Sequence, residues 1–105
     1  MNYHFEKLTR LGIQVPVLHK NWEEIEKLEQ EKILVTWEAI KGTIPDRIFE
    51  MEEVINFKQA QLGNEDNFEK SCLLNSEISE LASRINDLWI WFRTGEEIRG
   101  EKAHS

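Results

Sequence analysis

The chain has 105 residues, of which 40% are hydrophobic and 31% charged, as in a single folded domain. Its net charge is −7, with ten acids against four bases between residues 23 and 57. Phosphate binding needs clustered lysines and arginines, so this composition disfavours nucleic-acid binding as well as wholesale disorder. We expect a protein partner, which can be a second copy of the chain.

No secretion or membrane signal is evident in the sequence. It has no run of 18 apolar residues, and its beginning lacks an apolar stretch followed by a small-residue cleavage site. Cys72 is the only cysteine, so no intramolecular disulfide can form. These features predict a cytoplasmic protein with no membrane contact.

The first 20 residues predict a short helix or an extended arm. Phe5, Leu8 and Leu11 have helical spacing, and Gly12 is a natural residue to end such a helix. Residues 13–18 then alternate, and Pro16 favours extended geometry just before it. An edge strand is an alternative for this segment, but no second strand is evident to pair with it.

A first long helix is predicted at about 21–41. Asn21 and Glu24 have the spacing of a capping box, and Gly42 follows as a C-terminal stop. The apolar residues that share one half of this helix are Trp22, Ile25, Leu28, Ile33, Trp37 and Ile40. A tight bend at Gly42 is favoured over a continuous helix kinked at Pro45, because proline is tolerated in a first helical turn.

Two further helices, at about 44–62 and 66–93, are predicted to form an antiparallel hairpin that turns near Gly63. Each has apolar residues spaced by three and four: Ile44, Ile48, Met51, Ile55 and Leu62, then Leu74, Ile78, Leu81, Ile85, Leu88 and Phe92. The expected fold is therefore an all-α small helical bundle, built on this hairpin with the preceding helix and the N-terminal arm. Residues 1–95 would form one domain, and the polar residues 96–105 a flexible tail.

Five consecutive large apolar residues, from Leu88 to Phe92, place side chains on every side of the last helix. The last helix is also the longer of the pair: it is about 42 Å long, and the helix before it about 27 Å. Its end must therefore be covered by the first long helix near Trp37 and Ile40, by the N-terminal arm or by a second chain. Trp89 extends the main apolar stripe and is expected in the core, whereas Trp91 points elsewhere. For Trp91, burial under the arm and contact with another molecule are equally favoured.

The run Asn67-Phe68-Glu69-Lys70-Ser71-Cys72-Leu73-Leu74-Asn75-Ser76-Glu77-Ile78-Ser79-Glu80-Leu81 resembles the UVR motif. That motif is the short helical hairpin of the excinuclease B and C subunits and of some protease-adaptor proteins. The residues that match by spacing are Phe68, Glu69, Leu74, Ile78 and Leu81. Ser71 and Cys72 stand where alanines are usual, and Asn75-Ser76 replaces an Arg-Asp pair. The resemblance implies a protein–protein contact made by paired helices, not catalysis.

No pattern of catalytic, cofactor-binding or metal-ligating residues is found. The histidines, His4, His19 and His104, lie outside the predicted helical hairpin, and the single Glu101-x-x-His104 spacing lacks the second copy that a carboxylate bundle needs. Lys58 falls within the apolar stripe, where it either extends to solvent or pairs with an acid such as Glu69 across the hairpin. We therefore predict no catalytic residue, no cofactor and no metal.

The sequence favours a non-enzymatic interaction or adaptor protein that self-associates, as a homodimer, through surplus apolar helix faces. The residues expected to make this contact are Trp91, Phe49, Phe57 and Ile90. The alternative is a small helical enzyme or ligand-binding protein with a pocket near Trp37 and Trp89. Its polar residues would come from Glu38, Asn86 and Arg93.

Overall fold

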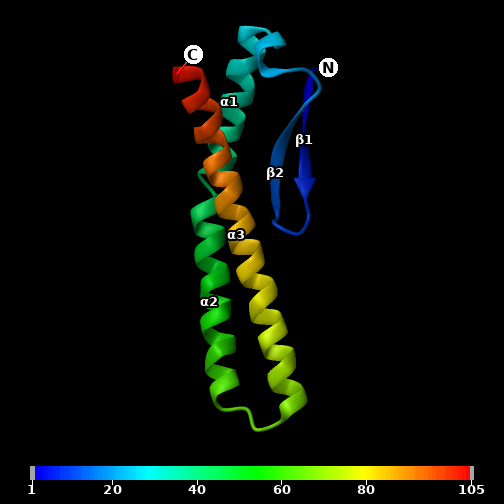
Figure 1. Ribbon diagram of the computed structural model, residues 1–105, viewed down its shortest axis with the longest axis vertical. Coiled ribbons are helices and arrows are strands. Elements are labelled where there is room, and N and C mark those ends of the chain that lie inside the picture. The colour runs from blue at the N-terminus through cyan, green and yellow to red at the C-terminus, as the bar shows by residue number, and fades with distance from the viewer. Residues whose placement is uncertain (1, 105) are drawn as a thin grey trace.

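The computed structural model describes the backbone of residues 2–104 and the side chains of residues 2–94. Two strands, β1 (Tyr3–Leu8) and β2 (Ile13–Leu18), precede a short 3₁₀ turn at Trp22–Glu24 and three helices. The helices are α1 (Lys27–Lys41), α2 (Ile44–Gly63) and α3 (Phe68–His104). The molecule is elongated, 59 × 25 × 19 Å, because α2 and α3 form a long antiparallel pair (Figure 1).

The prediction of an all-α fold is wrong, because the N-terminal residues form an antiparallel β-hairpin. β1 and β2 pair in register from Tyr3 opposite Leu18 to Leu8 opposite Ile13. Gly12 has a φ of 73° in the turn between them, so it closes a hairpin and does not end a helix. Nine helical residues are marginal alone, whereas pairing with β2 satisfies the backbone of β1. Residues 13–18 therefore pair with residues 3–8, the segment predicted to be a helix.

The first long helix begins later than predicted. Asn21 precedes only the 3₁₀ turn and makes no side-chain capping bond, and Ile25 and Glu26 are extended before α1 begins at Lys27. Ile25 is buried, so its packing outweighs the local capping pattern. Ile33 and Trp37 are buried as expected, but Leu28 is exposed, because α1 is covered along only part of its predicted apolar half.

The predicted helical hairpin is present, with α2 and α3 joined near Gly63. α1 and α2 are separate helices around Gly42 and Thr43, and Pro45 lies in the first turn of α2. α3 continues through Gly95 to His104, beyond the end predicted for it. The flexible tail predicted for residues 96–105 stays a prediction, because the side chains from 95 onwards lie outside the described residues.

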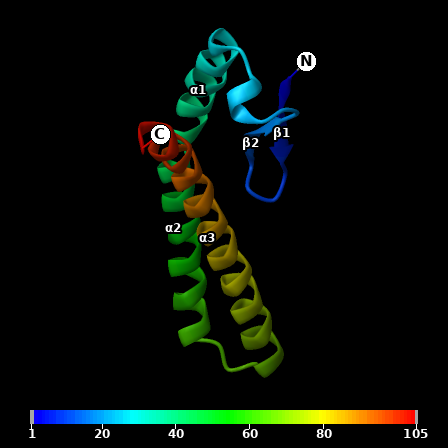
Figure 2. The ribbon, with the colours of Figure 1, turned by 45° about the horizontal axis from the view of Figure 1, so that its top comes forward.

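The hydrophobic core lies at one end of the molecule, which we call the core end. Its buried residues come from the turn between the strands, from β2 and from all three helices: Leu11, Ile13, Val15, Trp37, Ile44, Ile48 and Leu88. We call residues 49–63 of α2 and 68–87 of α3 the distal hairpin. Nothing in it is buried, and in Figures 1 and 2 no other element lies beside its lower half.

Candidate protein-interaction surface

The apolar end of α3 is covered within the chain itself. Leu88 is 0% exposed and belongs to the same core cluster as Ile44 and Trp37. Trp91 is half-buried and meets the edge of Trp37, with ring centroids 6.0 Å apart. It also lines a hollow of about 250 Å³ together with Leu8 and Leu11 of the β-hairpin. Trp91 is thus half-buried beside the N-terminal segment, and contact of its remaining surface with another molecule stays a prediction.

Trp89 differs from the prediction, because it is 42% exposed rather than part of the core. Its ring packs edge-on against Phe92 at a centroid distance of 5.6 Å. Helical spacing places Trp89 on the same stripe as Ile85, but α2 begins at Ile44, so the side of α3 at this level is only partly covered. The apolar stripe of α3 does not indicate how far along α3 the neighbouring helix α2 extends.

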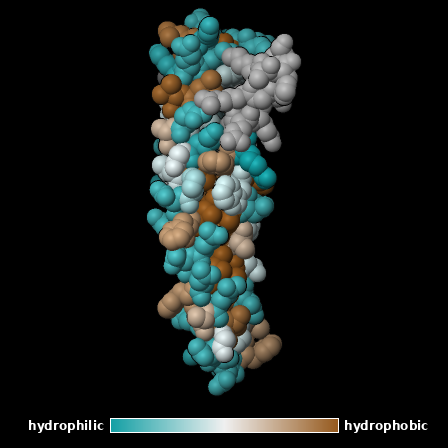
Figure 3. Space-filling view, turned by 90° about the vertical axis from the view of Figure 1, so that its left-hand side faces the viewer, coloured by the Kyte–Doolittle hydropathy of each residue, from teal (hydrophilic) through white to brown (hydrophobic). Residues whose placement is uncertain are grey.

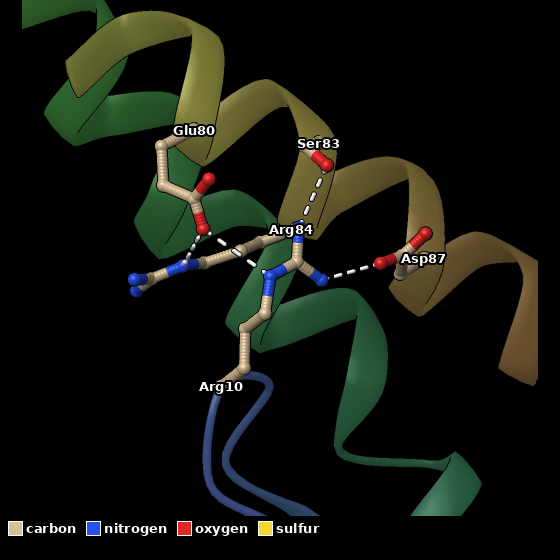
Figure 4. A network of polar contacts seen from close by, with 5 residues as sticks. All are labelled: Arg10, Glu80, Ser83, Arg84 and Asp87. Carbon is tan, nitrogen blue, oxygen red and sulfur yellow. Dashed lines mark hydrogen bonds and ion pairs between the residues drawn. The ribbon is translucent and has the colours of Figure 1, made fainter. Parts of the chain in front are cut away.

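The turn of the β-hairpin is attached to α3 by Arg10 and its four polar neighbours, Glu80, Ser83, Arg84 and Asp87, which we call the Arg10 cluster (Figure 4). The guanidinium donates to Glu80 Oε1 at 3.2 Å, to Ser83 Oγ at 2.7 Å and to Asp87. Arg84 donates to the same Glu80 oxygen at 3.2 Å. The hydrogen bond with Asp87 raises the pKa of Arg10, and the bonds from Arg84 and then Arg10 lower the pKa of Glu80.

A second attachment joins the same turn to α2. Arg47 Nε donates to the carbonyl oxygen of Leu11 at 3.1 Å, and the guanidinium passes directly over Gly12. A Cβ added at Gly12 would lie 1.9 Å from Arg47 Nη2. Glycine is therefore needed here both for the positive φ and for the close approach of Arg47. The two arginines hold the β-hairpin over the upper part of both helices.

The distal hairpin is held by a half-buried seam and by one cross-helix ion pair. Ile55, Leu62, Leu74 and Leu81 are all partly exposed. Lys58 Nζ lies 2.7 Å from Glu77 Oε2, so this lysine pairs across the hairpin, although with a different acid from Glu69. These contact residues belong to the predicted apolar stripes. On either side of the contact, the surfaces of α2 and α3 remain exposed.

A groove of about 490 Å³ runs along one side of the distal hairpin, and we call it the hairpin groove. Its α3 wall consists of Ala82 and Ile85. Its α2 wall is lined by Phe49, Glu52, Glu53, Ile55, Asn56 and Gln59. A second hollow, of about 410 Å³, lies between Val54 and Lys58 of α2 and the α3 residues Ser76, Glu77, Glu80, Leu81 and Arg84. This second hollow includes Glu80 and Arg84, so it adjoins the Arg10 cluster. The hairpin groove contains no residue of the Arg10 cluster.

The four residues predicted to make an intermolecular contact do not form one patch. Phe49 and Phe57 are both on α2 and are 61% and 66% exposed, but only Phe49 lines the hairpin groove. Ile90 is exposed on α3 and lines the hollow beside the β-hairpin with Trp91. Figure 3, which shows the side where α2 lies in Figure 1, has a broken line of hydrophobic residues running down the molecule between hydrophilic ones. The groove itself depends on pairing between α2 and α3, so no single stripe in the sequence indicated it.

A pocket near Trp37 and Trp89, which the alternative function needs, is not among the hollows described above and stays a prediction. Trp37 is buried in the core and Trp89 is exposed, and neither lines any of the three hollows. Asn86 and Arg93 are exposed on α3, and Glu38 lies 3.7 Å from Lys41. Within the described residues, no three His, Cys, Asp or Glu side chains come together, and no helix is long and apolar enough to cross a membrane.

Comparisons with protein families, with curated proteins and with solved structures find no match to this chain.

Proposed function

We propose that this protein is a non-enzymatic interaction protein that self-associates by packing the distal hairpin against that of a second copy. The observation that carries this proposal is that no residue from 49 to 87 is buried. Two helices alone bury only their shared seam, and small helical units reach adequate burial by adding further helices or by oligomerising. A second hairpin in the groove would convert the pair into a four-helix arrangement.

The available area is sufficient for such a contact. The distal part of α3 is about 30 Å long and that of α2 about 22 Å, and each helix is about 10 Å wide, so together they offer a face of about 500 Å² in projection. Side-chain relief raises the accessible area of that face toward the value of about 800 Å² per partner that is typical of stable complexes. No other element lies beside the lower half of this face (Figure 1).

The distribution of charge favours one arrangement of the two copies. Glu52 and Glu53 lie on the α2 wall of the hairpin groove, whereas the α3 wall, Ala82 and Ile85, carries no charge. A two-fold arrangement that sets α2 of each copy against α3 of the other keeps these carboxylates apart.

The resemblance of residues 67–81 to the UVR motif supports the same kind of contact, because that motif pairs helices between proteins. These residues are the start of α3 and lie within the distal hairpin. Phe68 is exposed at the beginning of this helix. The resemblance does not specify the partner, whereas the hairpin groove and its charges favour a second copy.

Sedimentation equilibrium tests the proposal, with Phe49→Asp and Phe57→Asp as matched variants. Both phenylalanines are exposed on α2, so neither change removes a core contact, but only Phe49 lines the groove. We expect the unaltered protein to form dimers below about 100 µM, a range that detects micromolar dissociation constants. Phe49→Asp should weaken the dimer at least about tenfold, the effect of losing about 1.4 kcal/mol of binding free energy, whereas Phe57→Asp should leave it nearly unchanged.

A strict monomer over this concentration range would overturn the proposed self-association. Equal weakening by the two variants would overturn the assignment of the contact to the hairpin groove. Because the chain carries a net charge of −7, we also expect the dimer to become tighter as salt screens the repulsion between copies.

A further inference from the structure

His4 and His19 meet at the open end of the β-hairpin, although 14 residues separate them in the chain. Their positions follow from the strand register, because His4 pairs with Val17 and the backbone of His19 donates to the carbonyl oxygen of Asn2 at 2.8 Å. His4 and His19 are therefore diagonal neighbours on one face of the hairpin. His4 Nδ1 lies 2.7 Å from His19 Nε2, and the ring centroids are 4.8 Å apart.

We propose that these two imidazoles form a two-nitrogen binding site for a divalent transition-metal ion with right-angled coordination, Cu(II) or Ni(II). Imidazole nitrogen is a favoured ligand for both ions, and both accept square-planar or tetragonal geometry. The site is separate from the hairpin groove, since neither histidine lines it. It therefore does not depend on self-association.

The spacing of the two nitrogens is compatible with right-angled coordination. With metal–nitrogen bonds of about 2.0–2.1 Å, two ligands at a right angle stand about 2.9 Å apart, and two at a tetrahedral angle about 3.3 Å apart. The observed 2.7 Å is a hydrogen bond in which one ring donates to the other, and a bound ion would replace its proton with only a small change in spacing at a right angle. Both side chains are exposed, so each ring can turn until its lone pair points at a shared ion.

The surroundings limit the site to two protein ligands. Within the described residues, no third His, Cys, Asp or Glu joins the pair, so water would occupy the remaining positions. The bound ion would connect the beginning of β1 to the residue after β2. Because this connection exists only when the strands are paired, metal binding stabilises the β-hairpin.

Two measurements test the site. In a Cys72→Ser background, which removes the exposed thiol that would reduce copper, electron paramagnetic resonance of bound Cu(II) should show two imidazole nitrogens. His19→Ala should leave one imidazole nitrogen bound to copper. It should also weaken binding at least about tenfold, because the second imidazole, held close to the first by the β-hairpin, is lost. In the unaltered chain, Ni(II) at about fivefold above its dissociation constant should raise the melting temperature by about 4–8 °C.

His19→Ala is the decisive variant. Copper can also bind His4 together with the backbone nitrogens before it, and such a site does not use His19. If His19→Ala keeps both the two-nitrogen spectrum and the affinity, the proposed site is wrong and the ion is held adventitiously. His104→Ala is the matched control and should change neither measurement. Both strand histidines are exposed, so the variants should fold, which far-ultraviolet circular dichroism of the metal-free proteins can establish.

Discussion

The two ends of the helical hairpin have similar apolar spacing but very different packing. At the core end, α2 and α3 are joined by α1 and by the β-hairpin, and both Ile44 and Leu88 are 0% exposed. In the distal hairpin α2 and α3 pack mainly against each other, with the β-hairpin reaching only its upper part through Arg10, and nothing from residue 49 to 87 is buried. The difference shows that helical periodicity identifies the side of a helix that can be buried, while the number of neighbouring elements determines whether burial is achieved.

This difference predicts a large contrast between two leucines of the same helix. Leu88→Ala should lower the free energy of unfolding by about 2–5 kcal/mol, because it opens a cavity in the packed end. Leu73→Ala, at a position that is 61% exposed, should change it by less than about 0.5 kcal/mol. Urea denaturation monitored by tryptophan fluorescence would measure both. Similar losses for the two variants would show that the distal hairpin is as well packed as the core end.

Two glycines extend the comparison to the backbone. Gly12→Ala should cost about 1–2 kcal/mol for the positive φ, and more if Arg47 loses its bond to the Leu11 carbonyl. Gly63→Ala, at the distal end of α2 with open space around it, should be neutral or stabilising by up to about 1 kcal/mol. Thermal unfolding of both variants would check this order. A neutral Gly12→Ala would argue against the β-hairpin turn described above.

The Arg10 cluster, at the boundary between the two regions, should make a small, pH-dependent contribution. Hydrogen bonds from Arg84 and Arg10 lower the pKa of Glu80 in the folded protein. The stabilisation is therefore complete at neutral pH, declines below the ordinary glutamate pKa of 4.5 and is lost as pH falls through the lowered value.

Glu80→Gln should accordingly reduce the loss of thermal stability between neutral and acidic pH. Glu69→Gln is the control, since Glu69 has no ion-pair partner among the described residues. Both carboxylates are exposed, so the difference should be the smallest of this series. Identical pH profiles for the two variants would mean that the hydrogen bonds of Glu80 do not contribute to stability.

The helical hairpin could be predicted from the sequence because its determinants are local and periodic. The stripes from Ile44 to Leu62 and from Leu74 to Phe92 identified the two long helices, and Pro45 and Gly63 indicated where α2 begins and ends. The β-hairpin could not be predicted in the same way. The spacing of Phe5, Leu8 and Leu11 also fits a helix, and only pairing with residues 13–18 decides between the two structures.

The candidate surface was predictable only in part. Phe49 and Phe57 are exposed aromatic residues, but Trp91 is packed against Trp37, and Trp89 is exposed in its place. These differences depend on where α2 begins relative to α3 and on what the β-hairpin covers. Both are features of the tertiary structure. The contact between His4 and His19 also follows from the strand register, which the periodicity of a single sequence does not encode.

Hydrogen exchange at two protein concentrations tests most directly whether a second copy covers the distal hairpin. At a concentration about tenfold above the dimer dissociation constant, amides of residues 49–63 and 68–87 should exchange up to about fivefold more slowly than in the dilute monomer. Amides of the β-hairpin and α1 should change less. Exchange in the distal hairpin that is fast and independent of concentration, up to about 100 µM, would contradict the proposed self-association.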